Sequence, residues 1–354
     1  MAMSVWSKLF GGSGEAPSPA DFTPPTHGRP TVVDAIPGKL IVTFYAHDVA
    51  DGHEANFITA VTDGLLVRHQ RELVVTLRIA ANDPVSERMQ ELARFFVTVL
   101  RWAEQRNLVE TGGVTRFGKR GMFGASGNGF LYVDARPLRG VAMAGHALAG
   151  ILVDAPEVET ALAHGVYRVL ARLGEQSACF PFPIWSDLTR RSVASPREAE
   201  SALGKFSRTR APGVHFVVEG KCLRVRIPRL ARAILARGIG SLEEGKPFAL
   251  LTEPAPNADA LLVWNPGQAD AKAIYGEGSE GARLTGGCLT VTPGALRDEI
   301  RVMEDGYALL LSRTTWGSLA SSLLGERTVS LPMADDATLE VEWLYEPSAS
   351  GARP

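Results

Sequence analysis

Residues 57–100 read FITAVTDGLLVRHQRELVVTLRIAANDPVSERMQELARFFVTVL, and this stretch decides the fold of the first half of the chain. Segment 72–79 alternates apolar and other residues, which is the period of a half-buried strand. A helix is predicted to start at Asp83-Pro84, because Asp83 can accept hydrogen bonds from unpaired backbone amides and Pro84 suits the first helical position. The apolar residues that follow predict a core helix buried on more than one face: Met89, Leu92, Ala93, Phe95, Phe96, Val99, Leu100, Trp102 and Ala103.

The composition predicts a globular protein with two domains. The chain has 354 residues, 45% hydrophobic and 21% charged, with a formal net charge of −2. This length exceeds one average domain. The wide spacing of Cys179, Cys222 and Cys288 indicates neither a disulfide framework nor zinc ligands, and it is typical of a reducing cytoplasm. No signal peptide is evident and no apolar run reaches the roughly 20 residues of a membrane span, so we expect a cytoplasmic protein.

Both halves mix strands with fewer helices, which predicts an α+β fold with mixed or antiparallel sheets and packed helices. We expect a flexible N-terminal tail at 1–30, an α+β domain at 31–193, a linker at 194–213, a second α+β domain at 214–347 and a C-terminal tail at 348–354. The first tail contains an apolar cluster, which is either a docking peptide or part of a tail that lies on its own domain: Trp6, Leu9 and Phe10.

Some local patterns are less decisive. Residues 164–173 (HGVYRVLARL) fit a strand or a helix, and Val166-Tyr167 favour a strand. The two prolines of FPFPIWSD at 180–187 exclude a regular helix, because each removes a backbone donor.

In the second half, Pro228 and Gly238 predict a helix over 228–237, with proline at its start and glycine beyond its end. Gly286-Gly287 before CLTVTP predicts a hairpin. Strands are expected at 214–218, 222–227, 248–252, 260–264, 307–312 and 338–344, with a short helix near 318–324.

Charge is unevenly distributed along the chain. Residues 187–237 contain twelve Lys/Arg and four acidic residues, whereas residues 298–346 contain ten acidic residues and three arginines. Either the two segments form solvated faces or faces that pair with each other, or the basic segment is a surface for an acidic partner.

Two local patterns suggest chemistry. The Gly-rich loop 111–129 leads into a strand and not a helix N-terminus, so it favours a connector or contact surface over a phosphate cradle. The order of residues in 47–54 matches no known metal-binding pattern and is interpreted as an exposed polar turn, with metal binding as the alternative: His47, Asp48, Asp51, His53 and Glu54. No catalytic group, metal or cofactor is predicted.

Nucleic-acid binding by residues 187–237 would need aromatic residues among the basic ones, but the aromatic residues there are few, namely Phe206 and Phe216. A protein partner is therefore favoured, with arginines that would attract and hydrogen-bond an acidic surface. The candidate contact residues are Arg190, Arg191, Arg224, Arg226, Arg229, and in the Gly-rich loop Arg120 and Phe123.

A family resemblance rests on short motifs in a fixed order: Gly64-Leu65, Glu72-Leu73 to Leu77-Arg78, MQELARFF at 89–96, Pro137-Leu138 and GILVDAP at 150–156. Over about residues 57–175 the chain resembles the suppressor-of-fused (SUFU-like) domain family of bacterial type. It departs from that pattern in its Gly-rich insertion, and its second half matches only weakly. The resemblance implies stoichiometric protein binding, since bacterial members are often immunity proteins that neutralise a toxin and the eukaryotic relative sequesters a transcription factor.

The sequence thus predicts a non-enzymatic protein-binding module, an immunity protein or an adaptor that sequesters a toxin or effector. One alternative is an enzyme with a dispersed active site, to which His146, His164 or Asp187 would contribute. The others are a nucleic-acid-binding protein that uses residues 187–237 and a structural component of a larger assembly.

Overall fold

The computed structural model describes residues 21–50, 52–118, 121–123, 127–194, 206–243, 246–265, 268, 270–276, 278 and 281–344. Helices and mixed sheets occur in both halves, so the α+β prediction is confirmed. The chain divides into two compact units: unit 1 runs through Val158 and includes Ile184–Arg191, and unit 2 comprises Glu159–Pro183 and continues from Ser192. Glu159–Pro183 therefore belongs to unit 2, whereas the sequence placed it in the first domain.

Unit 1 is built on one twisted sheet with the strand order β1-β2-β3-β4-β7-β6-β5, and β8 also pairs with β4. The pairs β1–β2, β2–β3 and β3–β4 are antiparallel, as expected of strands joined by short turns, and β4–β7 is parallel. The strands are β1 (Thr31–Ile36), β2 (Leu40–Ala50), β3 (His53–Asp63), β4 (Leu73–Arg78), β5 (Val114–Arg116), β6 (Gly129–Asp134), β7 (Leu148–Val153) and β8 (Trp185–Ser186).

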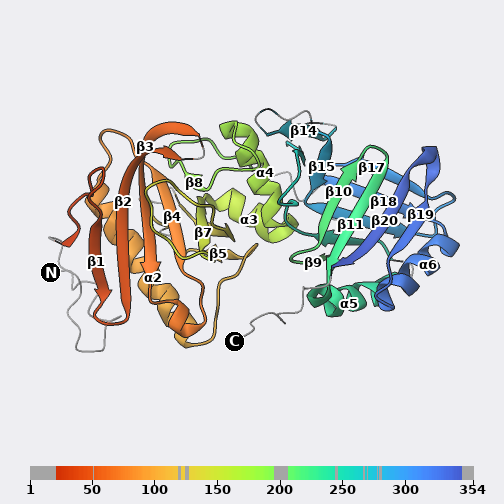
Figure 1. The fold of residues 1–354 in the computed structure, drawn as a ribbon, viewed down its shortest axis with the longest axis horizontal. Helices are drawn as coiled ribbons and strands as arrows, with labels where there is room; N and C mark the ends of the chain where they lie inside the picture. Colours follow the sequence, from red (N-terminus) through yellow and green to blue (C-terminus); the bar gives the residue numbers. More distant parts are fainter. Residues whose placement is uncertain are drawn as a thin grey trace, which may run out of the picture. The chain divides into compact units, whose positions relative to one another are not determined.

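The helix α2 (Val85–Glu104) covers the inner face of this sheet (Figure 1). Its buried residues, which include Met89, Phe96 and Leu100, pack against Val42, Phe44 and other inward side chains of the strands. This confirms the predicted core helix. Burial of so many aromatic and aliphatic side chains at about 1.5–3 kcal/mol each makes this packing the main source of stability in unit 1.

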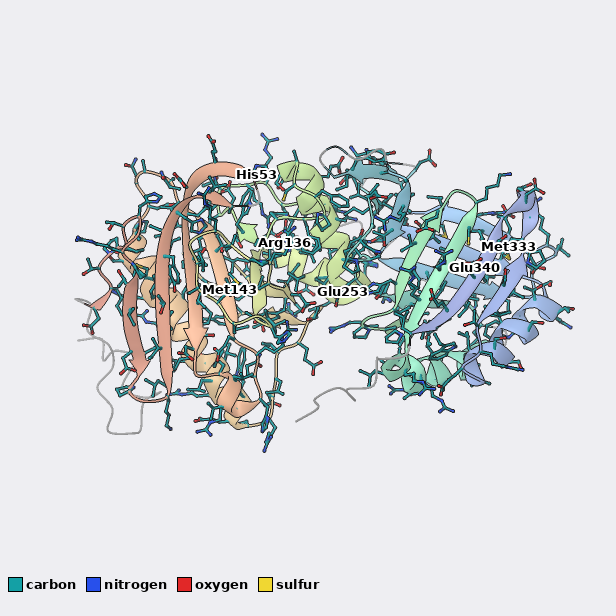
Figure 2. All side chains as sticks on the ribbon, in the orientation of Figure 1. His53, Arg136, Met143, Glu253, Met333 and Glu340 are labelled. Carbon is teal, nitrogen blue, oxygen red and sulfur yellow. The ribbon has the colours of Figure 1, made fainter. Side chains whose placement is uncertain are left out.

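Strand β4 is buried on both faces, and the prediction of a half-buried strand was wrong. Its residues Leu73 to Leu77 are all buried, and only Arg78 is exposed. The second face is covered by the segment between β6 and β7, because Val74 clusters with Ala147 and Met143 on the side away from α2. Met143 is labelled over this part of the sheet in Figure 2.

The predicted cap of α2 was also wrong. Pro84 itself is the N-cap, and no side chain caps the helix. The Asp83 carboxylate instead accepts a hydrogen bond from the Ala80 N–H (2.7 Å) and pairs with Arg88. The helix thus begins at Val85, one residue later than the predicted start at Pro84.

The Gly-rich segment is partly a strand. Within 111–129, Val114–Arg116 forms β5 and pairs antiparallel with β6. Phe117 packs edge-on against Phe130, with ring centroids 5.4 Å apart. The expectation of a simple connector across 111–129 was therefore wrong for these residues.

Unit 2 contains two sheets, with strand orders β14-β13-β15-β10-β11-β20-β19 and β17-β18-β16-β12-β9. The first comprises β10 (His215–Glu219), β11 (Cys222–Pro228), β13 (Ala260–Val263), β14 (Lys272–Tyr275), β15 (Arg283–Gly286), β19 (Val329–Pro332) and β20 (Thr338–Leu344). The second comprises β9 (Ser207–Arg210), β12 (Phe248–Leu251), β16 (Cys288–Pro293), β17 (Glu299–Met303) and β18 (Gly306–Leu311).

Helices α5 (Arg232–Glu243) and α6 (Arg313–Leu324) pack with both sheets around one apolar core. Gly238 does not end α5 as predicted. A Cβ on Gly238 would lie 2.6 Å from the Phe248 ring, so the glycine allows the helix to approach β12 closely. Strand β9 lies within the predicted linker 194–213, of which residues 195–205 lie outside the described residues.

Residues 166–173 are helical, so the strand prediction was wrong. They belong to α4 (Val166–Ser177), whose residues Val166 to Gly174 are all buried, whereas His164 ends α3 (Ala155–His164) and Gly165 lies between the two helices. Val166, Val169, Leu170 and Leu173 show the helical spacing that the β-branched pair obscured. The proline-rich segment that follows is not helical, as predicted, and its Phe180–Pro181 peptide bond is cis.

The predicted hairpin at Gly286-Gly287 was wrong, because β15 and β16 belong to different sheets of unit 2. Gly287 lies at the crossing and donates from its N–H to the Asp305 carbonyl (2.8 Å). A Cβ there would lie 1.5 Å from the Tyr167 ring. Gly287 therefore lets α4 approach the backbone at this crossing.

Among the described helices, none is long and apolar enough to cross a membrane.

Candidate functional site

Two of the predicted contact arginines lie on one face of strand β11, as the sequence indicated. Arg224 and Arg226 are in register with Glu340 and Glu342 on the parallel neighbour β20. Arg224 binds Glu340 and Glu219 (3.0 Å each), and Arg226 binds Glu342 (3.2 Å). Glu340, labelled in Figure 2, is thus part of a lattice of opposite charges on a sheet surface.

The other described arginines of this set lie elsewhere. Arg229 and Arg232 both pair with Glu326 (3.2 and 2.8 Å). Arg190 belongs to unit 1, where both Nη atoms contact the buried Glu157 carboxylate at 2.5 Å. Arg191 is exposed, and Arg120 lies outside the described residues.

These ion pairs join the basic segment 187–237 to the acidic segment 298–346. Arg224, Arg226 and Arg229 come from the basic segment, and their partners Glu340, Glu342 and Glu326 come from the acidic one. The two segments pair with each other, which was one of the interpretations left open. These three arginines would have to break internal ion pairs to bind an outside partner.

Phe123 packs against its own unit. Its ring lies 5.7 Å from the Arg88 guanidinium and joins the core beside α2, and its N–H donates to Glu91 (2.7 Å). Its backbone has φ of +52°, a conformation that this packing and hydrogen bond hold in place.

Most of the polar segment 47–54 belongs to the strands of the hairpin β2–β3, and only Gly52 among its described residues lies in a turn. His47 is buried, and its Nδ1 lies 2.9 Å from the Val49 carbonyl while its Nε2 lies 2.7 Å from the Thr59 hydroxyl. Thr59 in turn contacts Thr76 on β4 (2.8 Å). No three His, Cys, Asp or Glu side chains of the described residues are arranged to hold a metal ion, and Asp51 lies outside those residues.

The cysteines are free thiols. Cys179 and Cys288 are buried, and burial raises the pKa of the Cys288 thiol well above its usual value. Burial and the nearby Glu340 also raise the pKa of Cys222. A raised pKa keeps these two thiols protonated, which opposes nucleophilic reactivity.

The three residues named for an enzymatic alternative are divided between the two units. His146 and Asp187 belong to unit 1, and His164 belongs to unit 2. Burial favours the neutral Asp187 carboxyl, but hydrogen bonds from Thr189 and Arg78 hold its pKa below the usual value. Its ion pair with Arg78 (2.9 Å) ties the strand β8 region to β4.

Helix α4 carries a buried ionic cluster. The Arg168 side chain is fully buried and binds Asp305 through two hydrogen bonds (3.0 and 2.8 Å) and also binds Glu304. Although burial favours the neutral carboxyl, Arg168 holds the pKa of Asp305 below its usual value. The guanidinium groups of Arg168 and Arg172 both lie 5.0 Å from the Trp264 ring.

An open cavity of about 520 Å³ adjoins this cluster in unit 2. Its polar groups already bind one another, since Glu175 contacts Lys272 and Asn265, and Arg172 donates to the Trp264 carbonyl (2.6 Å). These contacts give the cavity wall a structural role. It is lined by Arg172, Glu175, Gln176, Ser192, Val193, Ala194 and Asn265.

The outer face of the first sheet differs from these internally paired groups. We use "outer face" for the side chains of β1–β3 that point away from α2: Val32, Asp34, Ile41, Thr43, Tyr45 and Asp63. Val32 is 61% and Ile41 38% exposed, although both lie in regular strands. The neighbouring part of this side, over β3 and β4, is covered by the segment that contains Met143.

The residues of the family resemblance have structural roles. Glu72 is buried and accepts hydrogen bonds from Thr62 Oγ1 (2.6 Å) and from the N–H groups of Gly64 (3.0 Å) and Leu66 (2.9 Å). Asp154 and Glu157 exchange hydrogen bonds between side chain and backbone (3.0 Å each) in the capping box of α3. These motifs fix turns and helix starts.

No protein-family model and no curated protein sequence matches the chain. Among solved structures, the crystal structure of Drosophila Suppressor of Fused is similar at 10% sequence identity and a TM-score of 0.35, over 86% of this chain and 89% of that chain. At that identity and TM-score, the likeness assigns neither a family nor a function to this chain.

Sequence reasoning missed the outer face. The alternation in TVVDAI at 31–36 was available, and it puts Val32 and Asp34 on one side of the strand. Only the position of α2 shows which side faces the core and which is exposed.

Proposed function

We propose that this protein is a non-enzymatic protein-binding module that contacts its partner through the outer face of β1–β3. The observation that carries this proposal is the exposure of Val32 and Ile41 on a sheet whose other side is packed against α2. Exposed aliphatic side chains gathered on a regular sheet surface are typical of contact sites between proteins.

The surroundings of these two residues support a flat contact surface. β1 is the edge strand of the sheet, and Val32 is in register with Thr43 on β2. Tyr45 is half-buried on the same side, and tyrosine is frequent in protein interfaces because its ring is apolar and its hydroxyl can hydrogen-bond.

The partner that we propose is a toxin or another effector protein, which this chain would neutralise by stoichiometric binding. This finer part of the proposal rests on the resemblance of residues 57–175 to SUFU-like domains.

The test uses the full chain with a photo-crosslinking amino acid in place of Val32, introduced in the native host. A crosslinked protein would be purified and its 1:1 complex with the wild-type chain reconstituted. The double variant V32S/I41S, which changes no charge, should then raise the dissociation constant by about tenfold or more, since centrally buried contacts carry most of the affinity.

The matched control is L296S/V302S, which removes two exposed aliphatic side chains of unit 2 (105% and 59% exposed). It should leave the affinity unchanged. Equal binding by wild type and V32S/I41S, or substrate turnover by a chain that forms no stoichiometric complex, would refute the proposal.

A further inference from the structure

We infer that the partner presents basic side chains on both sides of an apolar one, a preference opposite to that expected from the arginines in the sequence. This inference rests on the proposed function and specifies the chemistry of the same outer face. It follows from the placement of Asp34 and Asp63.

Asp34, Ile41 and Asp63 form one row across three strands. Asp34 is in register with Ile41, and Ile41 is in register with Asp63. Neighbouring strands lie about 4.8 Å apart, so the two carboxylates flank the exposed isoleucine at a separation of roughly 10 Å.

Both carboxylates are exposed, and neither forms an ion pair or a side-chain hydrogen bond with a described residue. They differ in this from Glu157, Glu326 and Glu340, each of which binds an arginine. The outer face therefore carries two carboxylates that pair with no basic side chain among the described residues of unit 1.

The carboxylates of Asp34 and Asp63 favour a partner with a basic surface. At physiological salt the Debye length is about 8 Å, so two carboxylates near each other still attract a cation that approaches the surface and repel an acidic one. An apolar side chain of the partner can meanwhile cover Ile41 and Val32.

The spacing suggests how such a segment is built. Two residues seven positions apart on one helix face are separated by about 10.5 Å, whereas alternate residues of a strand are separated by about 6.6 or 13 Å. A helix with Lys or Arg at positions i and i+7 and an apolar residue at i+3 or i+4 matches the row.

The probe is a display library of random 16-residue peptides, selected on the immobilised full chain. Enriched peptides would be synthesised and their affinity measured for wild type, for D34N/D63N and for the control E87Q/E110Q. The control makes the same change of charge at two other exposed sites of unit 1.

Enriched peptides should contain Lys or Arg on both sides of an apolar residue. Their affinity should fall about tenfold or more in D34N/D63N, decrease with added salt and remain unchanged in E87Q/E110Q. Enrichment of acidic peptides, or equal affinity for wild type and D34N/D63N, would overturn the inference. If V32S/I41S abolishes binding of those same peptides, the proposed function still stands; if it does not, both fail.

One other occupant would also overturn the inference. Self-association of the wild-type chain that D34N/D63N abolishes, measured by sedimentation, would show that a second copy covers the outer face.

Discussion

At the scale of single residues, a few buried polar side chains determine local geometry. Glu72 is 6% exposed, and its carboxylate accepts hydrogen bonds from Thr62 near the end of β3 and from the N–H groups of Gly64 and Leu66 in the turn that joins β3 to β4. Gly64 in that turn has φ of +120°, and a Cβ there would lie 2.1 Å from the Lys39 carbonyl oxygen. The turn thus depends on both a glycine and an acceptor at fixed positions.

Replacing Glu72 with glutamine should destabilise the protein by about 1–3 kcal/mol, because one carboxylate oxygen becomes an amide that cannot accept a hydrogen bond. Urea unfolding would measure the change. E54Q is the control, since Glu54 is exposed on the neighbouring strand β3. An equal effect of E54Q and E72Q would contradict the assigned role.

His47 predicts a pH dependence of stability. Burial lowers its pKa below 6.5. Because the Val49 carbonyl can only accept, Nδ1 carries the proton of the neutral ring and Nε2 accepts from Thr59. The unfolded chain binds a proton near pH 6.5, so this contribution to stability is full above pH 6.5 and decreases as the pH falls towards the folded-state pKa.

Urea unfolding at pH values between about 7.5 and 5 would measure that slope. The H47Q variant should show a smaller slope than wild type, whereas H146Q should keep it, since His146 is exposed. Part of the slope should remain in H47Q, because burial also lowers the pKa of His215. An unchanged slope in H47Q would exclude His47 as a source.

At the scale of elements, close contacts between helices and backbone explain where glycine is needed. α4 packs its Tyr167 ring against Gly287, where the chain crosses from β15 to β16. Tyr167 is buried, so its ring has little space to move away.

The G287A variant should lower the free energy of unfolding by at least about 1–3 kcal/mol, the usual cost of overpacking a core. The control is G317A, because Gly317 lies within α6 and a Cβ there meets nothing within 4 Å. G317A should stabilise the protein by about 0.5–1 kcal/mol. Denaturant unfolding would show both changes, and a G287A variant as stable as wild type would disprove the close contact.

At the scale of the whole molecule, the two compact units do not correspond to two continuous stretches of sequence. Unit 2 includes Glu159–Pro183, which precedes the last segment of unit 1. Within unit 2, α4 is buried by Leu261 and Val263 of β13 and by the ionic contact between Arg168 and Asp305. A cut at the expected domain boundary would therefore separate α4 from its packing partners.

A fragment of residues 31–193 should accordingly expose the apolar surface of α4. We expect it to bind a hydrophobic dye and to aggregate, whereas the full chain should do neither to the same extent. Dye fluorescence and light scattering at equal concentration would measure this. A monomeric fragment that unfolds cooperatively and binds no dye would contradict the assignment of α4 to unit 2.

Elements with a local sequence signal can be predicted without the tertiary structure. The apolar periodicity of residues 85–104 predicts a buried helix. The prolines at 181 and 183 exclude a regular helix there, whatever the surrounding tertiary structure. The mixture of strands and helices, and hence the α+β class, follows from the same local patterns.

Tertiary structure alone decided what depends on partners far along the chain. Val166-Tyr167 favours a strand from local preference, but residues 166–173 form a buried helix that packs Tyr167 and Ala171 against β13. Arg224 and Glu340 are more than one hundred residues apart, so only the pairing of β11 with β20 neutralises them. The exposed row of Asp34, Ile41 and Asp63 likewise exists only once three strands are in register and α2 covers their other side.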